Sequence, residues 1–285
     1  MATFIAAAIQ MRSGTDPAAN AETLRERVAE AAGRGARYVQ TPEMTGAVQR
    51  DRRALLSVLR DEESDVVVRT AAELARTHEI FLHIGSTPIP LGEEMVANRA
   101  FVFAPDGSIV CRYDKMHMFD VDLDNGESWR ESAVYRPGEQ VVVADLPFAS
   151  VGLAVCYDLR FPELFRRQAL AGADILTVPA AFTRQTGEAH WHVLQRARAI
   201  ENGAFVIAAA QGGVHEDGRE TYGHSLIVDP WGNVIAETAG DEPAVITAEI
   251  DTGAVGLARG KIPNLKNARP IGEAQHYAAE ARRQA

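Results

Sequence analysis

The chain contains a series of short, almost entirely apolar segments that alternate with helical patterns. The clearest of these segments are residues 4–10, 151–155 and 205–210. A strand with one face in water alternates apolar and polar residues, whereas a strand that is covered on both faces is apolar throughout. We therefore predict that residues 1–285 form one α/β domain in which two sheets are covered by outer helices.

The rest of the chain continues this alternation. Further strands are predicted at 38–41, 80–84, 99–104, 109–113, 141–144, 175–178, 225–228, 234–237 and 245–250. Helices are predicted at 21–32, 51–59, 64–77, from Pro162 onward and at 190–202, with Asn20 and Ser64 as the N-terminal caps of the first and the third. Residues 116–139 form a long polar stretch whose aromatic side chains favour an ordered, functional loop. From about residue 252, one helix and a polar tail remain.

The composition argues against several kinds of partner. The formal net charge is −10 and the chain has no run of lysines and arginines, which argues against nucleic acid and anionic membranes as partners. Its two cysteines, Cys111 and Cys156, are too few for a disulfide framework and indicate a reducing compartment. The N-terminal segment lacks the basic residues of a signal peptide and is predicted to be the first strand. We therefore expect a cytoplasmic protein.

Cys156 lies where a predicted strand ends, and Pro162 then opens a helical pattern. Loops at the carboxyl ends of strands are where open α/β sheets place their chemistry. A cysteine at such a position can also be a small buried hydrophobic residue, because free cysteine is among the most buried residue types. The charged residues Asp158, Arg160 and Glu163 follow it directly. They favour a reactive thiol, because the formation of a thiolate depends on the local electric field.

Two other charged residues share this structural context. Glu43 follows the strand at 38–41, and Lys115 follows the strand at 109–113. Taken singly, each would be assigned to a solvated surface side chain, the usual environment of Lys and Glu. Together with Cys156 they form a complete chemical set. A carboxylate can take the proton of a thiol nucleophile, and an ammonium group can stabilise the oxyanion of a tetrahedral intermediate.

The segments around these three residues resemble the signatures of the nitrilase superfamily of carbon–nitrogen hydrolases. Glu43 lies in Thr-Pro-Glu-Met, Lys115 in Tyr-Asp-Lys-Met-His-Met-Phe-Asp, and Cys156 in Gly-Leu-Ala-Val-Cys-Tyr-Asp-Leu-Arg-Phe-Pro-Glu. The resemblance extends from the first strand to about Ile250. It implies a four-layer αββα sandwich and a Glu–Lys–Cys catalytic triad. It also implies that Glu131, which by itself looks like any loop carboxylate, is a second active-site glutamate.

Two further stretches, 187–201 and 222–232, resemble the branch of the superfamily that contains omega-amidase and deaminated glutathione amidase. The segment 209–225, with Arg219, is closer to the deaminated glutathione amidases. The resemblance implies a cysteine-dependent amidohydrolase that cleaves the side-chain amide of a small 2-oxo acid to the carboxylate and ammonia through a thioester. The alternatives are an N-carbamoyl amino acid hydrolase or a nitrilase on the same fold, and a catalytically silent binding or scaffold protein.

The expected substrate is a small amide that carries a carboxylate. Arg160, on the turn after the nucleophile, is predicted to bind this carboxylate with both arms of its guanidinium group. The alternative for Arg160 is a structural ion pair with Asp158 or Glu163. Three further residues are predicted to line the pocket: Tyr157, Phe182 and Thr183.

No metal and no cofactor are expected. His190 and His192 are two positions apart, so they would lie on different faces of a helix and could not share a metal ion. The glycine pairs lack the strand–glycine–helix arrangement of a nucleotide-binding loop. The family resemblance also implies a homo-oligomer, a dimer or larger.

Overall fold

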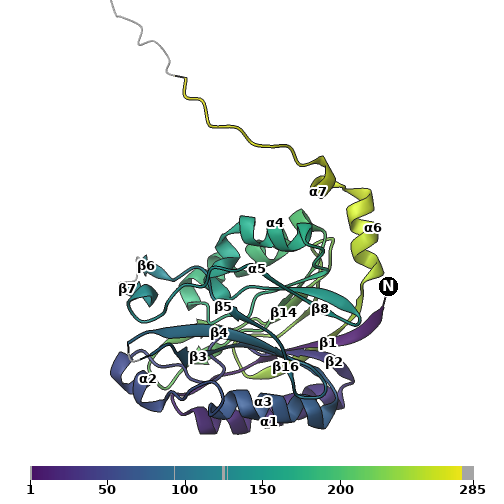
Figure 1. The fold of residues 1–285 in the computed structure, drawn as a ribbon. Coiled ribbons are helices and arrows are strands. Elements are labelled where there is room, and N and C mark those ends of the chain that lie inside the picture. The colour runs from purple at the N-terminus through teal and green to yellow at the C-terminus, as the bar shows by residue number, and fades with distance from the viewer. Residues whose placement is uncertain (1, 93, 124–125, 127, 278–285) are drawn as a thin grey trace, which may run out of the picture.

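The computed structural model describes residues 2–92, 94–123, 126 and 128–277, and it has four layers (Figure 1). Two six-stranded sheets lie face to face. Helices α1 (Pro17–Gly33) and α3 (Val66–His78) cover the outer face of one sheet. Helices α4 (Pro162–Leu170) and α5 (Arg184–Asn202) cover the outer face of the other. The predicted αββα arrangement is confirmed.

Each sheet has a parallel centre with antiparallel flanks. The first sheet runs β16 (Ala244–Asp251), β1 (Thr3–Gln10), β2 (Ala36–Gln40), β3 (Phe81–Pro90), β4 (Val96–Phe103) and β5 (Ile109–Asp114). The second runs β15 (Val234–Glu237), β14 (Leu226–Val228), β11 (Phe205–Ala208), β10 (Ile175–Thr177), β9 (Ala149–Leu153) and β8 (Val142–Leu146). The parallel strands are β1, β2 and β3 in the first sheet and β9, β10 and β11 in the second. Parallel strands end at the same edge of a sheet, so the segments that follow β9 and β10 emerge side by side.

The two faces of the first sheet belong to different hydrophobic cores. Along β1, Ala6 and Ala8 lie in the core between the sheets, whereas Ala7 and Ile9 lie in the core beneath α1 and α3. Successive side chains of a strand point to opposite faces, so a strand that serves both cores must be apolar at every position. This is the physical reason why the segment 4–10 could be recognised as a strand.

Shorter elements complete the fold. They are α2 (Arg52–Val58), β6 (Asp120–Asp122), β7 (Ser128–Arg130), the 3₁₀ turns η1 (Glu131–Ala133) and η2 (Cys156–Arg160), β12 (Gly212–Val214), β13 (Glu220–Tyr222), α6 (Gly253–Lys261) and α7 (Asn264–Asn267). The long polar stretch 116–139 therefore contains the hairpin β6–β7, and its residues 124–125 and 127 lie outside the described part. The hairpin β12–β13 was not predicted, because its strands are too short to show a pattern. In the described part of the chain, no helix is long and apolar enough to cross a membrane.

Both predicted helix caps are wrong. Helix α1 is capped by Asp16, and Asn20 lies inside the helix, where its side chain binds the backbone of neighbouring loops. Helix α3 is capped by Asp65 and not by Ser64. Each helix is preceded by several residues that can cap, and the choice depends on where the incoming chain bends, which the sequence pattern does not specify.

Helix α5 begins at Arg184 rather than at His190. The first turn contains Gly187, and a glycine inside a helix is normally unfavourable. A Cβ atom at this position would lie 2.3 Å from the side chain of Tyr222 on β13, so the glycine is needed for close packing of the hairpin against the helix. Gly187 looks like a helix boundary in the sequence, but it lies inside the helix because only a glycine leaves room for Tyr222.

Candidate active site

The four predicted catalytic residues line one cavity of about 560 Å³. Glu43 follows β2, Lys115 follows β5, Glu131 opens η1 and Cys156 opens η2. Glu43, Lys115 and Cys156 are buried, with exposed fractions of 3%, 2% and 7%. The structure thus brings together residues that lie up to 113 positions apart, the distance from Glu43 to Cys156 in the sequence.

The backbone at Cys156 is held in a strained turn. Its φ angle is 51°, in the left-handed region that side-chain-bearing residues seldom adopt. The N–H of Cys156 donates to the carbonyl of Pro179, which follows β10, at 2.9 Å. In the described part of the chain, the N–H of Tyr157 has no hydrogen-bond acceptor. The turn therefore presents the thiol to the cavity beside a free backbone donor.

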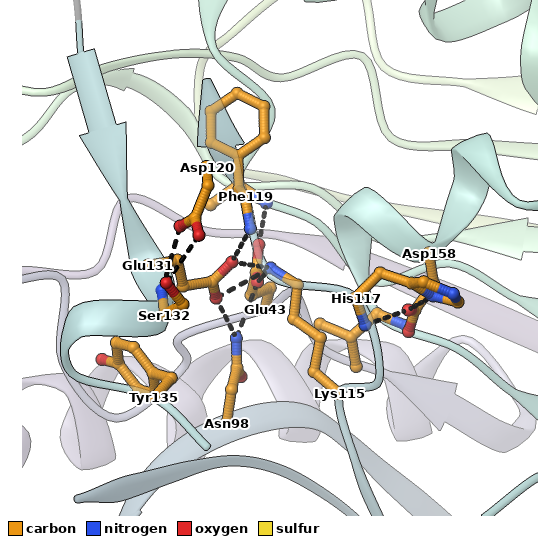
Figure 2. A network of polar contacts seen from close by, with 12 residues as sticks. Glu43, Asn98, Lys115, His117, Phe119, Asp120, Glu131, Ser132, Tyr135 and Asp158 are labelled. Carbon is orange, nitrogen blue, oxygen red and sulfur yellow. Dashed lines mark hydrogen bonds and ion pairs between the residues drawn. The ribbon is translucent and has the colours of Figure 1, made fainter. Parts of the chain in front are cut away.

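Lys115 lies between two glutamates (Figure 2). Its Nζ is 2.9 Å from Oε1 of Glu43, and 2.9 Å and 2.8 Å from the two carboxylate oxygens of Glu131. A buried charge is tolerated only when it is paired and hydrogen-bonded, and here one ammonium group serves two carboxylates.

Further donors fix the two carboxylates in place. Asn98 on β4 donates its side-chain amide to Oε1 of Glu43 at 2.8 Å and to Oε1 of Glu131 at 3.3 Å (Figure 2). The second oxygen of Glu43 accepts from the N–H of Ala181 at 2.9 Å, and that of Glu131 accepts from the N–H of Phe119 at 2.6 Å. The sequence analysis did not identify Asn98. An asparagine within a largely apolar strand is the signal that could have pointed to it.

The interactions within this cluster shift the pKa values of its groups and so determine which of them are charged in the free site. Burial and the neighbouring Glu43 carboxylate raise the pKa of the Cys156 thiol well above its ordinary value. Burial alone would also raise the pKa of Glu43, but the charge of Lys115 and hydrogen bonds from its neighbours bring it below the usual value. Burial would lower the pKa of Lys115, and Glu131 and Glu43 together raise it well above normal. The free site therefore holds a neutral thiol, an ionised Glu43 and an ammonium group.

Asp158 connects the two segments that carry Lys115 and Cys156. One of its oxygens accepts from the backbone and the ring Nδ1 of His117, at 3.0 Å and 2.7 Å. The other accepts from the hydroxyl of Tyr113 at 2.7 Å and from the N–H of Val155 at 2.9 Å. Asp158 is completely buried. The sequence singled it out only as a charge near the cysteine, and its role as a link between two loops was not predicted.

The cavity wall contains three of the four predicted substrate-binding residues. Tyr157, Phe182 and Thr183 line it. Arg160 is not among the described lining residues; its guanidinium carbon lies 5.9 Å from the ring centre of Tyr157 and 5.4 Å from that of Phe182. Its nitrogens lie 3.4 Å from Nδ1 of His190, and Asp158 is engaged elsewhere, so the alternative ion pair with Asp158 does not form. Arg160 therefore packs against two aromatic rings of the cavity wall.

The remaining charged residues of the cavity wall are basic. Besides the catalytic cluster, the described lining residues include Arg50, Arg52, Arg130 and Arg219. The chain as a whole has a net charge of −10. A basic cavity in an acidic protein attracts anions locally, because a lined cleft focuses the field of its own charges.

This fold and this site define the chain as a carbon–nitrogen hydrolase. The profile of the carbon–nitrogen hydrolase family matches residues 5–260, and the chain belongs to that family. Within the family it is similar to deaminated glutathione amidases. The protein of that name from Synechocystis is 37% identical over 94% of this chain and 98% of the relative. The mouse protein of that name is 38% identical over 93% of this chain and 83% of the relative. The predicted family and its branch are confirmed.

Solved structures agree with the fold. The C. elegans NitFhit protein superposes with a TM-score of 0.87 at 33% identity, over 94% of this chain and 65% of that longer chain. Nit3 of Saccharomyces cerevisiae superposes with a TM-score of 0.82 at 28% identity, over 92% of this chain and 94% of the other. An amidase mutant from Nesterenkonia sp. AN1, with a TM-score of 0.79 at 26% identity over 93% and 94% of the two chains, carries the acetamide moiety of fluoroacetamide on its active-site cysteine.

Proposed function

We propose that this protein is a cysteine-dependent amidohydrolase that cleaves the side-chain amide of a small 2-oxo acid through a thioester. The substrate would be of the deaminated glutathione or the 2-oxoglutaramate kind. The observation that carries the proposal is the contact of a buried thiol, a carboxylate and an ammonium group in a cavity whose other charged wall residues are basic. The names of the relatives supply the 2-oxo acid.

In the first half-reaction, Glu43 takes the proton of the Cys156 thiol while the sulfur attacks the amide carbon. The proton moves from the thiol of Cys156 to the carboxylate of Glu43, so the negative charge moves from Glu43 to the sulfur. The net charge of the cluster does not change. Such a transfer avoids the cost of placing a new charge in a buried site. A C–S bond forms, and the carbonyl electron pair moves onto oxygen.

The oxyanion has two donors within the site. The N–H of Tyr157 is one, because it has no acceptor in the described chain. Lys115 is the other, because an ammonium group has three hydrogens and two of its three contacts go to the same carboxylate, that of Glu131. Lys115 can exchange one of these two contacts for the oxyanion and still hold Glu43 and Glu131. Preorganised donors of this kind stabilise the transition state strongly.

Glu43 then completes the reaction. It returns its proton to the amine nitrogen as the C–N bond breaks, which releases ammonia from a primary amide or an amine from a substituted one. In the second half-reaction it takes a proton from water, whose oxygen attacks the thioester carbon. The C–S bond then breaks, the acid product forms, and Glu43 returns the proton to the departing sulfur, which restores the thiol. Glu131 orients Lys115 throughout, because it holds both the ammonium group and the N–H of Phe119.

We propose that Arg160 binds or orders the substrate carboxylate from the edge of the aromatic wall. Its guanidinium group packs over Tyr157 and Phe182, both of which line the cavity. It has no carboxylate partner within the described residues. A small rotation of the side chain would turn the planar fork toward the cavity, where a carboxylate could accept two parallel hydrogen bonds.

Release of ammonia or amine from a panel of amides tests this proposal. The panel should contain ω-amides of 2-oxo acids, the matching amino acid amides, nitriles and N-carbamoyl amino acids, with Cys156→Ala as the blank. We expect the oxo-acid amides to be the best substrates. A preference for nitriles or N-carbamoyl compounds would select one of the alternative hydrolases. The absence of turnover with every compound would support a binding or scaffold protein.

We also propose that the chain forms a homo-oligomer. Val193 and Ile200, two turns apart on α5, are 68% and 51% exposed. Trp231, on the β14–β15 turn, is 53% exposed, and its neighbour Gly232 lies against Ile200. Exposed apolar groups of this size are a common feature of subunit interfaces. Light scattering of the wild type and of Val193→Glu tests the proposal; a wild-type mass of one chain would contradict it.

A further inference from the structure

The catalytic residues come from both sheets. Glu43 and Lys115 follow strands β2 and β5 of the first sheet, whereas Cys156 follows β9 of the second. The distance between the thiol and its proposed base therefore depends on how the two sheets are held together at this edge. Proton transfer is sensitive to that distance, because a general base must lie within hydrogen-bond reach of the proton that it takes.

The side chain of Gln211 connects the two sheets at this point. Gln211 follows β11 of the second sheet, and its exposed fraction is 0%. Its side-chain nitrogen donates to the backbone carbonyl of Glu43 at 3.0 Å and to the hydroxyl of Ser13, which follows β1, at 2.8 Å. The carbonyl of Met44 lies 3.4 Å from the same nitrogen. The side-chain oxygen accepts from the N–H of Ser13 at 3.0 Å. All these partners belong to segments that follow strands of the first sheet.

The backbone of Gln211 is bound to the second sheet. Its N–H donates to the carbonyl of Ala180 at 2.8 Å, and the N–H of Ala180 donates to the carbonyl of Ala209 at 2.9 Å. The residue after Ala180 is Ala181, whose N–H donates to the second carboxylate oxygen of Glu43 at 2.9 Å. Gln211 therefore holds Glu43 from two directions. It binds the backbone of Glu43 directly, and it fixes the segment that supplies a donor to the carboxylate.

The turn that carries Glu43 is strained. Met44 has a φ angle of 56°, in the left-handed region that favours glycine. Such a backbone persists only where its surroundings fix it. Here the amide of Gln211 binds the carbonyls of Glu43 and Met44, and the hydroxyl of Ser86 accepts from the N–H of Met44 at 3.0 Å. Without the bonds from Gln211 the turn should relax, and Glu43 would then move relative to Cys156.

Gln10 on β1 is a second buried glutamine between the sheets. Its exposed fraction is also 0%. Its side-chain nitrogen donates to the carbonyls of Gly240 and Glu242, at 2.7 Å and 2.8 Å. Its side-chain oxygen accepts from the N–H of Ser225, which precedes β14 of the second sheet, at 2.9 Å. Gln10 thus has the same chemistry as Gln211, but its side chain binds neither the proposed base nor the donor of that base.

We propose that Gln211 is a positioning residue that sets the distance between Glu43 and Cys156 for proton transfer. It acts through Glu43, because it is not among the described residues that line the cavity. The inference rests on the proposed function, in which Glu43 is the base of both half-reactions, and it adds the residue that fixes this base.

The variant Gln211→Met removes the donor and the acceptor and keeps the length of the side chain. We would measure its turnover of the best oxo-acid amide of the substrate panel. The value of kcat should fall by about 10- to 100-fold, because a displacement of about 1 Å in a catalytic group is sufficient for a loss of that order. KM should stay within about 3-fold, because Glu43 serves both half-reactions and no substrate contact is removed. If Gln211→Met does not fold, Gln211→Asn takes its place, since it keeps an amide and withdraws it by one methylene group.

A second measurement needs no substrate. The charge of Glu43 raises the pKa of the Cys156 thiol, so the rate at which a neutral reagent alkylates this thiol depends on the position of Glu43. At neutral pH, Gln211→Met should change this rate by at least ~3-fold. In a Glu43→Gln background the same substitution should leave the rate within about 2-fold, because the charge through which Gln211 acts is then absent. All rates are measured in a Cys111→Ala background, so that Cys156 is the one thiol of the chain.

Gln10→Met is the matched control. It should lower the melting temperature as Gln211→Met does, because each loses its contacts with two backbone carbonyls. Its kcat and its alkylation rate should stay within about 2-fold of the wild type.

Three results would overturn the inference and leave the proposed function intact. The first is a Gln211→Met variant that is alkylated at the wild-type rate. The second is an equal change of that rate with and without the Glu43 carboxylate, and the third is an equal loss of kcat in Gln10→Met. A wild type that hydrolyses no compound of the panel would refute the proposed function, and the alkylation rates would still decide whether Gln211 acts on Glu43.

Discussion

Asp158 is a single group on which the geometry of both catalytic loops depends. Its two oxygens each accept two hydrogen bonds, and all four donors come from the segments next to Lys115 and Cys156. Replacement by asparagine keeps the size of the side chain and removes the acceptor capacity of one oxygen. Whichever way the amide turns, its NH₂ group faces one backbone N–H, that of His117 or that of Val155, which then has no acceptor.

The loss can be worked out from these contacts. Hydrogen bonds to a charged group contribute about 1.5–3 kcal/mol each, so the loss of one such bond should lower the free energy of unfolding by about 1.5–3 kcal/mol. For a chain of this size, such a change should lower the melting temperature by at least about 3 °C. Activity should also fall, by about 10- to 100-fold, because a displacement of 1 Å in a catalytic group is sufficient for a loss of that order.

Thermal unfolding and amide hydrolysis of Asp158→Asn check both numbers. Asp106→Asn is the matched control: its contacts to Ser108, at 2.8 Å and 2.6 Å, both use the same oxygen, which asparagine retains. The control should unfold and turn over like the wild type. If Asp158→Asn melts within about 2 °C of the wild type and keeps full activity, the assignment of Asp158 as the link between the two loops is wrong.

Five further predictions concern the reacting groups and Arg160. Cys156→Ala should abolish turnover and leave the fold intact, whereas Cys111→Ala should remain active; more than trace hydrolysis by Cys156→Ala would exclude it as the nucleophile. Burial and the charge of Glu43 raise the pKa of the Cys156 thiol above the ordinary value of about 8.5. The rate of its alkylation by a neutral thiol reagent should therefore still increase with pH beyond about 8.5. A rate that becomes constant at lower pH would indicate a preformed thiolate. Glu43→Gln removes that charge, so it should make alkylation at neutral pH faster while hydrolysis stops; accumulation of a stable acyl-enzyme would limit Glu43 to the second half-reaction. Lys115→Ala should lower kcat by at least ~100-fold, the effect of losing an oxyanion donor, and a loss below 10-fold would contradict that role. Arg160→Lys should raise KM for oxo-acid amides and reduce their kcat/KM by at least ~10-fold with little change for neutral amides; equal losses for both, with a lower melting temperature, would make Arg160 a structural residue.

Local signals in the sequence were sufficient for the layers of the fold. A strand between two cores has to be apolar on both faces, and residues 4–10, 151–155 and 205–210 carry that pattern without reference to any other part of the chain. Local sequence patterns were less informative about the residues at which the helices begin and end. Asp16 caps α1 in place of Asn20, and α5 extends back to Arg184 through Gly187, because each of these outcomes depends on a neighbour that is remote in sequence.

The active site likewise contains residues that a local sequence pattern indicates and residues whose role depends on neighbours that are distant in the sequence. Cys156, Glu43 and Lys115 could be singled out because each follows a recognisable strand and because the three groups together make chemical sense. Asn98 and Asp158 have no such local context. Asn98 acquires its role from the two carboxylates that it joins, and Asp158 from the two loops that it holds.

The sequence by itself determined the class of fold, the three residues that we propose as nucleophile, acid–base group and oxyanion donor, and a strongly acidic chain with a net charge of −10. The tertiary structure alone decided that the cavity of this acidic protein is basic. Arg50 precedes α2, Trp129 lies on β7 and Arg219 lies between β12 and β13, so no local sequence pattern joins them and only the tertiary structure brings them together. Net charge is a sum over the whole chain, whereas the field that a substrate meets depends on which few side chains the fold places around it.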